Sequence, residues 1–133
     1  MMRLEHIGIA IKHKEEAARL FARLLGTEAY KSEEVTSEGV ETSFFGLDNT
    51  KIELLNSLSD DSAIERFISK RGEGIHHLAF EVEDIHAEIQ RLKAAGFSFV
   101  SETPKDGADN KLICFLHPKS TQGVLVELCQ EKQ

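Results

Sequence analysis

A short apolar strand pattern that contains a histidine occurs twice in the chain, and this duplication limits the possible folds more than any other feature. The first copy covers residues 4–11 and contains His6. The second covers residues 75–82 and contains His77. Both copies alternate apolar side chains with small or polar ones, as half-buried strands do. The chain is therefore predicted to be built from two copies of one module.

Both copies continue with the same order of predicted elements. An amphipathic segment with one apolar face predicts a helix that ends at a glycine. Three short β-type runs follow each glycine. Each copy is therefore predicted to be a βαβββ module. The predicted helices are residues 14–25 and 84–95, ending before Gly26 and Gly96; the predicted strands that follow are 28–34, 40–46 and 50–55, then 97–101, 111–117 and 123–129.

The length of the chain allows one domain made of these two copies. A chain of 133 residues and 14.9 kDa is near the usual size of one domain, which excludes two separately folded enzymatic domains. Residues 60–71 begin with acidic and serine residues, keep their apolar residues on one face and predict a connecting helix. We therefore predict a single domain over residues 1–133, with module 1 at 3–57 and module 2 at 74–130.

Composition excludes several classes of partner. The 16 Lys and Arg against 23 Asp and Glu give a net charge of -7 without an acidic tail, which argues against a nucleic-acid-binding surface. No apolar run approaches the ~18 residues that span a bilayer, and the N-terminus lacks the apolar part of a signal peptide. Cys114 and Cys129 lie in apolar stretches and are expected to be buried, reduced thiols. We expect a soluble, cytoplasmic protein without nucleic-acid or membrane partners.

Four polar residues occupy equivalent positions in the two copies. Alternation places His6 and His77 on the strand face opposite the apolar side chains. Glu53 and Glu127 each lie between two apolar residues of a later strand and are predicted to point away from the helices. Each residue alone has an ordinary alternative, a core or surface histidine or an exposed edge glutamate. Their pairing between the two copies favours a shared function.

A pseudo-twofold relation between the modules would bring these four side chains together. Two imidazoles and two carboxylates form a suitable site for divalent Zn, Co, Ni, Mn or Fe, and the two negative charges would neutralise the ion. We therefore predict a metal site, with an inert polar face as the alternative. The predicted ligands are His6, Glu53, His77 and Glu127.

The doubled βαβββ pattern with these four residues resembles the vicinal oxygen chelate superfamily over nearly the whole chain. Within that superfamily, the chain is most similar to the methylmalonyl-CoA epimerase family. The stretches that carry the likeness are residues 6–10, 49–55, 72–82, 117–120 and 123–128. The resemblance implies a glyoxalase-like α+β fold, in which the two modules form a curved mixed sheet with a metal-containing cleft. It also assigns the ligand role to the same four residues.

The resemblance further implies epimerisation of an acyl-CoA by a homodimer that depends on a divalent ion such as Co, Zn, Ni or Mn. Inversion needs acid/base groups on both faces of the reacting carbon. Glu127 is the first candidate for this role, and Glu41 is the second. In that family a glutamate in the strand after the first Gly-Val is a proposed base. Here Glu41 and Thr42 follow Gly39-Val40, and Thr42 stands at the equivalent position, so the chain departs from the family pattern there. Residues expected to meet the acyl or phosphate groups of CoA are Lys119, Ser120 and Lys111.

Three other functions remain open from the sequence. A lactoylglutathione lyase of the glyoxalase I type would use the same metal and a similar proton transfer. A metal-free binding module of the drug-resistance kind shares the fold but generally lacks the ligands. An extradiol dioxygenase is disfavoured, because its two histidines and one carboxylate leave more open metal positions than four protein ligands do.

Overall fold

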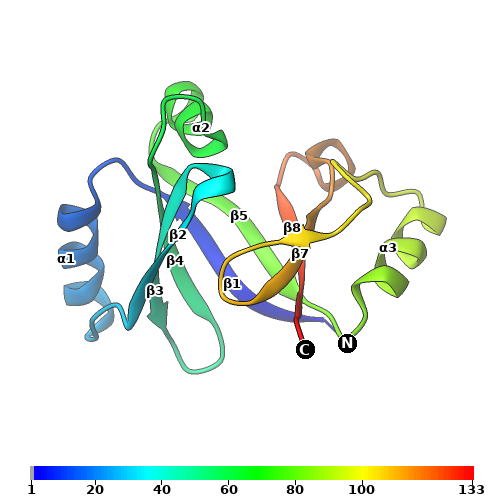
Figure 1. Ribbon diagram of the computed structural model, residues 1–133, viewed down its shortest axis with the longest axis horizontal. Helices are drawn as coiled ribbons and strands as arrows, with labels where there is room; N and C mark the ends of the chain where they lie inside the picture. Colours follow the sequence, from blue (N-terminus) through cyan, green and yellow to red (C-terminus); the bar gives the residue numbers. More distant parts are fainter. Residues whose placement is uncertain (1) are drawn as a thin grey trace. The chain divides into compact units, whose positions relative to one another are not determined.

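The computed structural model describes residues 2–133 and has the element order expected of two βαβββ modules (Figure 1). The α-helices are α1 (Lys14–Leu25), α2 (Ala63–Arg71) and α3 (Ile85–Ala94), with short 3-10 helices η1 (Thr36–Glu38) and η2 (Pro118–Thr121). The strands are β1 (Arg3–Ala10), β2 (Lys31–Val35), β3 (Val40–Gly46), β4 (Lys51–Ser57), β5 (Gly74–Glu81), β6 (Lys105–Asp106), β7 (Lys111–Phe115) and β8 (Val126–Glu131).

The described chain forms two compact units that differ from the two sequence modules. The first unit is Ile7–His76, and the second unit combines residues 2–6 with His77–Gln133. The boundaries cut through β1 and β5, so each of these strands contributes residues to both units. His6 and His77 therefore both belong to the second unit, although they come from different modules.

The first unit has the strand order β2-β3-β4-β1, with antiparallel β2, β3 and β4. Helix α1 covers one face of these strands, where Phe21 packs with Phe45 and Leu54. Helix α2 packs against the other face through Ile64 and Ile68. Both helices have the amphipathic pattern that burial of a single face requires.

The second unit has the strand order β1-β5-β8-β7-β6. Strands β5 and β8 are parallel, whereas β7 runs antiparallel to β8 and to β6, so the sheet is mixed as predicted. Helix α3 lies beside β7 and β8 (Figure 1). Its Ile85, Ile89 and Leu92 share a core with Leu128 of β8. The opposite face of these strands is free of the α3 core and holds the polar residues described below.

The predicted helices agree with the structure at most of their ends. Helix α1 covers the predicted residues 14–25 and ends at Gly26, whose φ of 72° is the left-handed conformation that suits glycine. Asp84, the first residue of the predicted helix 84–95, accepts a hydrogen bond from the N–H of Ala87 and so caps α3. The connecting helix begins at Ala63, three residues after the predicted start, because the Ser62 side chain caps it by accepting from the N–H of Glu65. None of the helices in the described chain is long and apolar enough to cross a membrane.

The strand predicted at residues 97–101 is reduced to a single bridge, flanked by hydrogen bonds from the N–H of Val100 to the Phe115 carbonyl and from the N–H of His117 to the Ser98 carbonyl. In this segment only Phe99 makes a bridge, to Leu116, and the short β6 lies at the edge of β7 instead. The N–H of Ser98 donates to the hydroxyl of Ser120, so this donor is not available for a strand ladder. The last strand also begins late, at Val126, because η2 and the turn at Gln122, with a φ of 60°, occupy the preceding residues.

Candidate metal centre

Three of the predicted ligands lie together in the second unit. His6 comes from β1, His77 from β5 and Glu127 from β8, which are consecutive strands of the sheet. All three residues are buried, with exposed fractions of 5%, 6% and 5%. Alternation turns these side chains away from the α3 core, which takes up Phe80 and Leu128 from the same strands. The polar face predicted from the sequence is therefore present in this unit.

The donor atoms of these three residues converge. His6 Nε2 lies 3.0 Å from His77 Nε2, and His77 Nε2 lies 3.2 Å from Glu127 Oε1. The third separation, from His6 Nε2 to Glu127 Oε1, is 3.9 Å. Two donors bound to one zinc ion at about 2.0–2.1 Å and spread at a tetrahedral angle would lie roughly 3.4 Å apart. The three separations bracket this value, so the residues fit a divalent ion.

The chemistry of the three donor groups also fits a divalent ion. Two neutral imidazoles and one carboxylate are ligands that zinc and its first-row neighbours share. An ionised carboxylate is costly to bury unless a cation or several hydrogen bonds compensate it. A divalent ion between the three donor atoms would supply this compensation to Glu127 and use the lone pairs of both histidines. A phenylalanine, Phe115, packs its ring edge-on against His77 and limits the motion of that imidazole.

The fourth predicted ligand, Glu53, belongs to the first unit. It is buried in β4, between Ile52 and Leu54, which both pack in the core under α1. Its side chain therefore faces away from α1, as alternation predicted. The ammonium of Lys51 lies 3.6 Å from Glu53 Oε2. The ligand role of Glu53 stays a prediction.

Glu41 lies on the strand face opposite to Glu53. The pairing of β3 with β4 places Glu41 across from Asn56, whereas Phe44 is across from Glu53. Glu41 Oε2 accepts a hydrogen bond of 2.7 Å from Lys14 at the start of α1. This bond and the charge of Glu41 raise the pKa of Lys14 above its usual 10.5. These contacts indicate that Glu41 anchors α1 and do not support the catalytic role predicted for it.

Lys111 has a structural environment that differs from the predicted contact with CoA. It is buried, and its ammonium lies 2.5 Å from Glu131, 3.6 Å from Glu81 and 3.9 Å from Glu5. Burial alone would lower the pKa of Lys111, but the hydrogen bond to Glu131 and the three carboxylate charges outweigh it and raise the pKa above 10.5. Three carboxylates already compensate this cation, which leaves it poorly suited to a phosphate group.

The other two predicted substrate residues lie in η2. Lys119 is exposed, and its backbone N–H donates to His117 Nδ1 at the start of this turn. The hydroxyl of Ser120 accepts from the N–H of Ser98 and so holds the preceding segment in place. The Lys119 side chain is thus accessible to a phosphate, while the Ser120 hydroxyl already has a structural bond. The substrate roles of both residues stay predictions.

Sequence reasoning missed one residue of the cluster, Glu5. Its side chain is buried, and its Oε1 lies 2.6 Å from Nδ1 of the adjacent His6. The available signal was a glutamate next to a candidate ligand within an apolar strand. Such a signal is weak because the preceding residue normally points to the other face of a strand.

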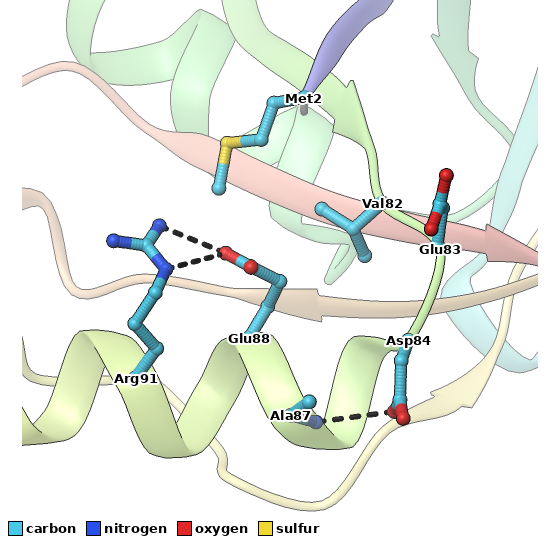
Figure 2. Close-up of a pocket in the computed structure, with 7 residues that line it drawn as sticks. All are labelled: Met2, Val82, Glu83, Asp84, Ala87, Glu88 and Arg91. Atoms are coloured by element: carbon cyan, nitrogen blue, oxygen red, sulfur yellow. Dashed lines mark hydrogen bonds and ion pairs between the residues drawn. The ribbon is translucent and has the colours of Figure 1, made fainter.

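A surface pocket of about 350 Å³ lies apart from these residues, at the start of α3 (Figure 2). It is lined by Met2, Val82, Ala87 and four charged residues whose side chains bond within the unit or face solvent. Figure 2 shows Arg91 turned onto Glu88 and Asp84 bonded to the N–H of Ala87. The guanidinium of Arg91 donates to Glu88 Oε2 at 2.8 Å. The one cation of this pocket is thereby neutralised, so the pocket has no strong feature for an anionic substrate.

The two cysteines are buried and free, as predicted. Burial, with a smaller effect of the Glu127 charge, raises the pKa of Cys114 to about 11. The same two causes raise the pKa of Cys129 further. Thiols in this state are poor metal ligands and poor nucleophiles at neutral pH.

Comparisons with known proteins agree with this fold. The family model described as the glyoxalase/bleomycin resistance protein/dioxygenase superfamily matches residues 5–115. The ethylmalonyl-CoA/methylmalonyl-CoA epimerase of Cereibacter sphaeroides is 45% identical over 130 residues, which are 96% of this chain and 97% of that protein. The mitochondrial methylmalonyl-CoA epimerase of Dictyostelium discoideum is 43% identical over 127 residues, covering 95% of this chain and 76% of that protein.

A solved structure shows the same likeness in three dimensions. A variant of the methylmalonyl-CoA epimerase of Streptomyces coelicolor, in complex with 2-nitronate-propionyl-CoA, superposes with a TM-score of 0.92 and 30% sequence identity. The match covers 97% of this chain and 94% of that chain. The resemblance expected from the sequence is thereby confirmed. The chain belongs to the glyoxalase/bleomycin resistance protein/dioxygenase superfamily and, within it, to the methylmalonyl-CoA epimerase family.

Proposed function

We propose that this protein is a divalent-metal-dependent epimerase that interconverts the two epimers of methylmalonyl-CoA. The observation that carries the proposal is the buried cluster of His6, His77 and Glu127, found in a chain whose relatives are epimerases of this substrate. The Streptomyces coelicolor relative holds a CoA thioester analogue, which supports an acyl-CoA as the substrate class.

The metal would be held by His6, His77 and Glu127, with Glu53 proposed as the fourth ligand. Glu53 occupies in β4 the place that Glu127 occupies in β8, each between two apolar neighbours of the last long strand of its module. When bound, the ion supplies a Lewis acid that stabilises negative charge developing on the carboxylate and thioester oxygens of a malonyl thioester. The donor set suits Co, Zn, Ni and Mn.

Side chains of the protein must remove the proton from the reacting carbon and return it. The carbon between the carboxylate and the thioester of the substrate is acidic, and inversion requires its proton to leave one face and return to the other. Glu127 is the proposed base, since a carboxylate has two oxygens and can contact an ion with one while accepting a proton with the other. Its burial keeps competing water away from the transferred proton.

The group that acts on the second face is less well supported. Glu41 keeps this role only as the sequence-based candidate, because its bond to Lys14 opposes it. Thr42 lies on the same strand face as Glu53 but has no carboxylate. A single mobile base would also allow inversion if the deprotonated substrate rotated to present its other face to that base.

For the CoA portion, Lys119 is the residue we propose to meet a phosphate, because its side chain is exposed and cationic. Ser120, its neighbour in η2, is proposed to contact the same part of CoA, whereas Lys111 is not proposed for this contact because three carboxylates surround its ammonium. A homodimer and a cytoplasmic location remain predictions from the sequence and its resemblance.

The proposal is tested by proton exchange at the reacting carbon. The metal-loaded protein is incubated with methylmalonyl-CoA in deuterated water, and loss of the α-proton signal is followed by NMR. We expect exchange well above the protein-free rate, and a loss of about 10²–10⁴-fold in the Glu127→Gln variant. Background exchange together with isomerisation of the glutathione hemithioacetal would instead identify a lactoylglutathione lyase.

A further inference from the structure

The bond between Glu5 and His6 joins two adjacent buried residues and has a fixed polarity. Glu5 Oε1 lies 2.6 Å from His6 Nδ1. A carboxylate can only accept a hydrogen bond, and a neutral imidazole carries a single N–H. The bond therefore places the ring proton on Nδ1 and leaves the lone pair on Nε2, the atom that faces His77 and Glu127.

The second oxygen of Glu5 is directed at cations. Oε2 lies 3.9 Å from the ammonium of Lys111 and 4.0 Å from the guanidinium of Arg3. Oε1 therefore contacts the imidazole of His6, whereas Oε2 faces the two cations. Both cations also contact Glu81, Arg3 at 2.9 Å and Lys111 at 3.6 Å. Glu5 is held in the orientation that its bond to His6 requires.

We propose that Glu5 is a positioning residue for the metal centre: it holds His6 in the tautomer and orientation that present Nε2 to the ion. Histidines that bind metals commonly donate their other ring nitrogen to a carboxylate, which fixes the ring and makes the ligand more basic. Glu5 is the carboxylate that accepts from Nδ1 of His6, and Lys111 and Arg3 hold its other oxygen in place. This inference rests on the proposed metal site, and none of the predicted ligand or base roles includes it.

The chain offers a matched control. Glu81→Gln removes a carboxylate that contacts the same two cations while leaving the Glu5–His6 bond in place. Glu5→Ala removes the bond, and Glu5→Gln keeps an oxygen that can accept from Nδ1. Zinc affinity is measured by calorimetry for the wild type and all three variants. We expect Glu5→Ala to lose about 10–100-fold in affinity, Glu5→Gln to lose less, and Glu81→Gln to remain near the wild type.

A measurement on the metal-free protein tests the tautomer directly. Long-range proton–nitrogen NMR correlations distinguish the two neutral forms of a histidine, and we expect His6 to be protonated at Nδ1 in the wild type. Protonation at Nε2, or a folded Glu5→Ala variant with wild-type zinc affinity, would overturn the proposal. If Glu5→Ala fails to fold, the wild-type spectrum and Glu5→Gln decide. If the proposed metal site itself does not exist, the wild-type protein will bind no zinc, and this outcome is distinct from the failure of the Glu5 proposal.

Discussion

At the scale of single residues, Lys111 shows how a buried charge sets stability. Replacing it by methionine would remove the cation that Glu131 shares with Glu5 and Glu81 and leave only Arg3 beside the latter two, and we expect a loss of about 2–4 kcal/mol in the free energy of unfolding at pH 7. Urea denaturation measures this loss. Lys132→Met removes a surface pair with Asp106 and serves as the control, with an expected change under about 1 kcal/mol.

The pH dependence of that loss follows from the raised pKa of Lys111. A cation whose pKa is higher in the folded state contributes its full stability below the unfolded value of 10.5. The contribution disappears as the pH rises through the folded value. The stability difference between wild type and Lys111→Met is therefore expected to be constant from pH 7 to 9 and to shrink above 10.5. A difference that grows with pH in the alkaline range would refute this account.

The buried thiols give a second prediction at this scale. With a pKa of about 11 for Cys114 and a still higher one for Cys129, almost no thiolate exists at pH 8. We expect neither cysteine to react with a disulfide reagent in the folded protein and both to react in 6 M guanidinium. Rapid reaction of one thiol in the native state would show that its environment is more open than described.

The comparison of the two copies predicted which polar side chains would lie close together, while their ligand roles stay predictions. His6, His77 and Glu127 were found as partners because each has a counterpart in the other copy, and the structure brings these three together. Glu5 and Lys111 have no such counterpart signal. Their roles depend on distances between side chains that are far apart in sequence, such as Lys111 and Glu5, and no local pattern encodes these.

At the scale of the elements, helix α3 depends on its N-terminal cap. Asp84→Ala removes the acceptor for the N–H of Ala87 and is expected to lower the free energy of unfolding by about 1 kcal/mol. Asp84→Asn keeps a side-chain oxygen in the same place and is expected to be nearly neutral. Chemical denaturation of the two variants tests this pair, and an equal loss in both would show that charge, not capping, is the stabilising factor.

The helices were better predicted from the sequence than the strands. Apolar periodicity and end signals such as Gly26 and Asp84 are local, so α1 and α3 were located almost to the residue. The strand predicted at residues 97–101 has β-type residues but forms only one bridge, because the hydroxyl of Ser120, which lies 22 positions from Ser98, accepts the hydrogen bond of the Ser98 N–H. Strand formation depends on such distant partners, which the sequence alone does not reveal.

At the scale of the whole molecule, the proposed ligands would couple metal binding to folding. His6 and His77 come from opposite ends of the chain's first 77 residues, and Glu127 lies near the C-terminus, so the three donors meet only in the folded second unit. An ion that binds the folded state alone stabilises it by about 2.7 kcal/mol at 100 times its dissociation constant. We expect zinc to raise the melting temperature of the metal-free protein in a concentration-dependent way, and no rise in the His77→Ala variant.

The βαβββ order and the α+β class were predictable at this scale because each helix and strand pattern occurs in both copies of the module. The division into units was not, since it cuts β1 between His6 and Ile7 and joins residues 2–6 to the second half of the chain. Nothing in the periodicity of residues 4–11 marks this boundary. It arises from the pairing of strands that are distant in sequence.

The central claim is that His6, His77 and Glu127 hold one divalent ion. Elemental analysis of the purified protein after loading with zinc and removal of excess metal measures this directly, with His6→Ala and Glu127→Ala treated in the same way. The account predicts one ion per chain in the wild type and much less than one in each variant, with all three proteins folded by circular dichroism. A wild-type protein without stoichiometric metal, or variants that retain it, would contradict the account.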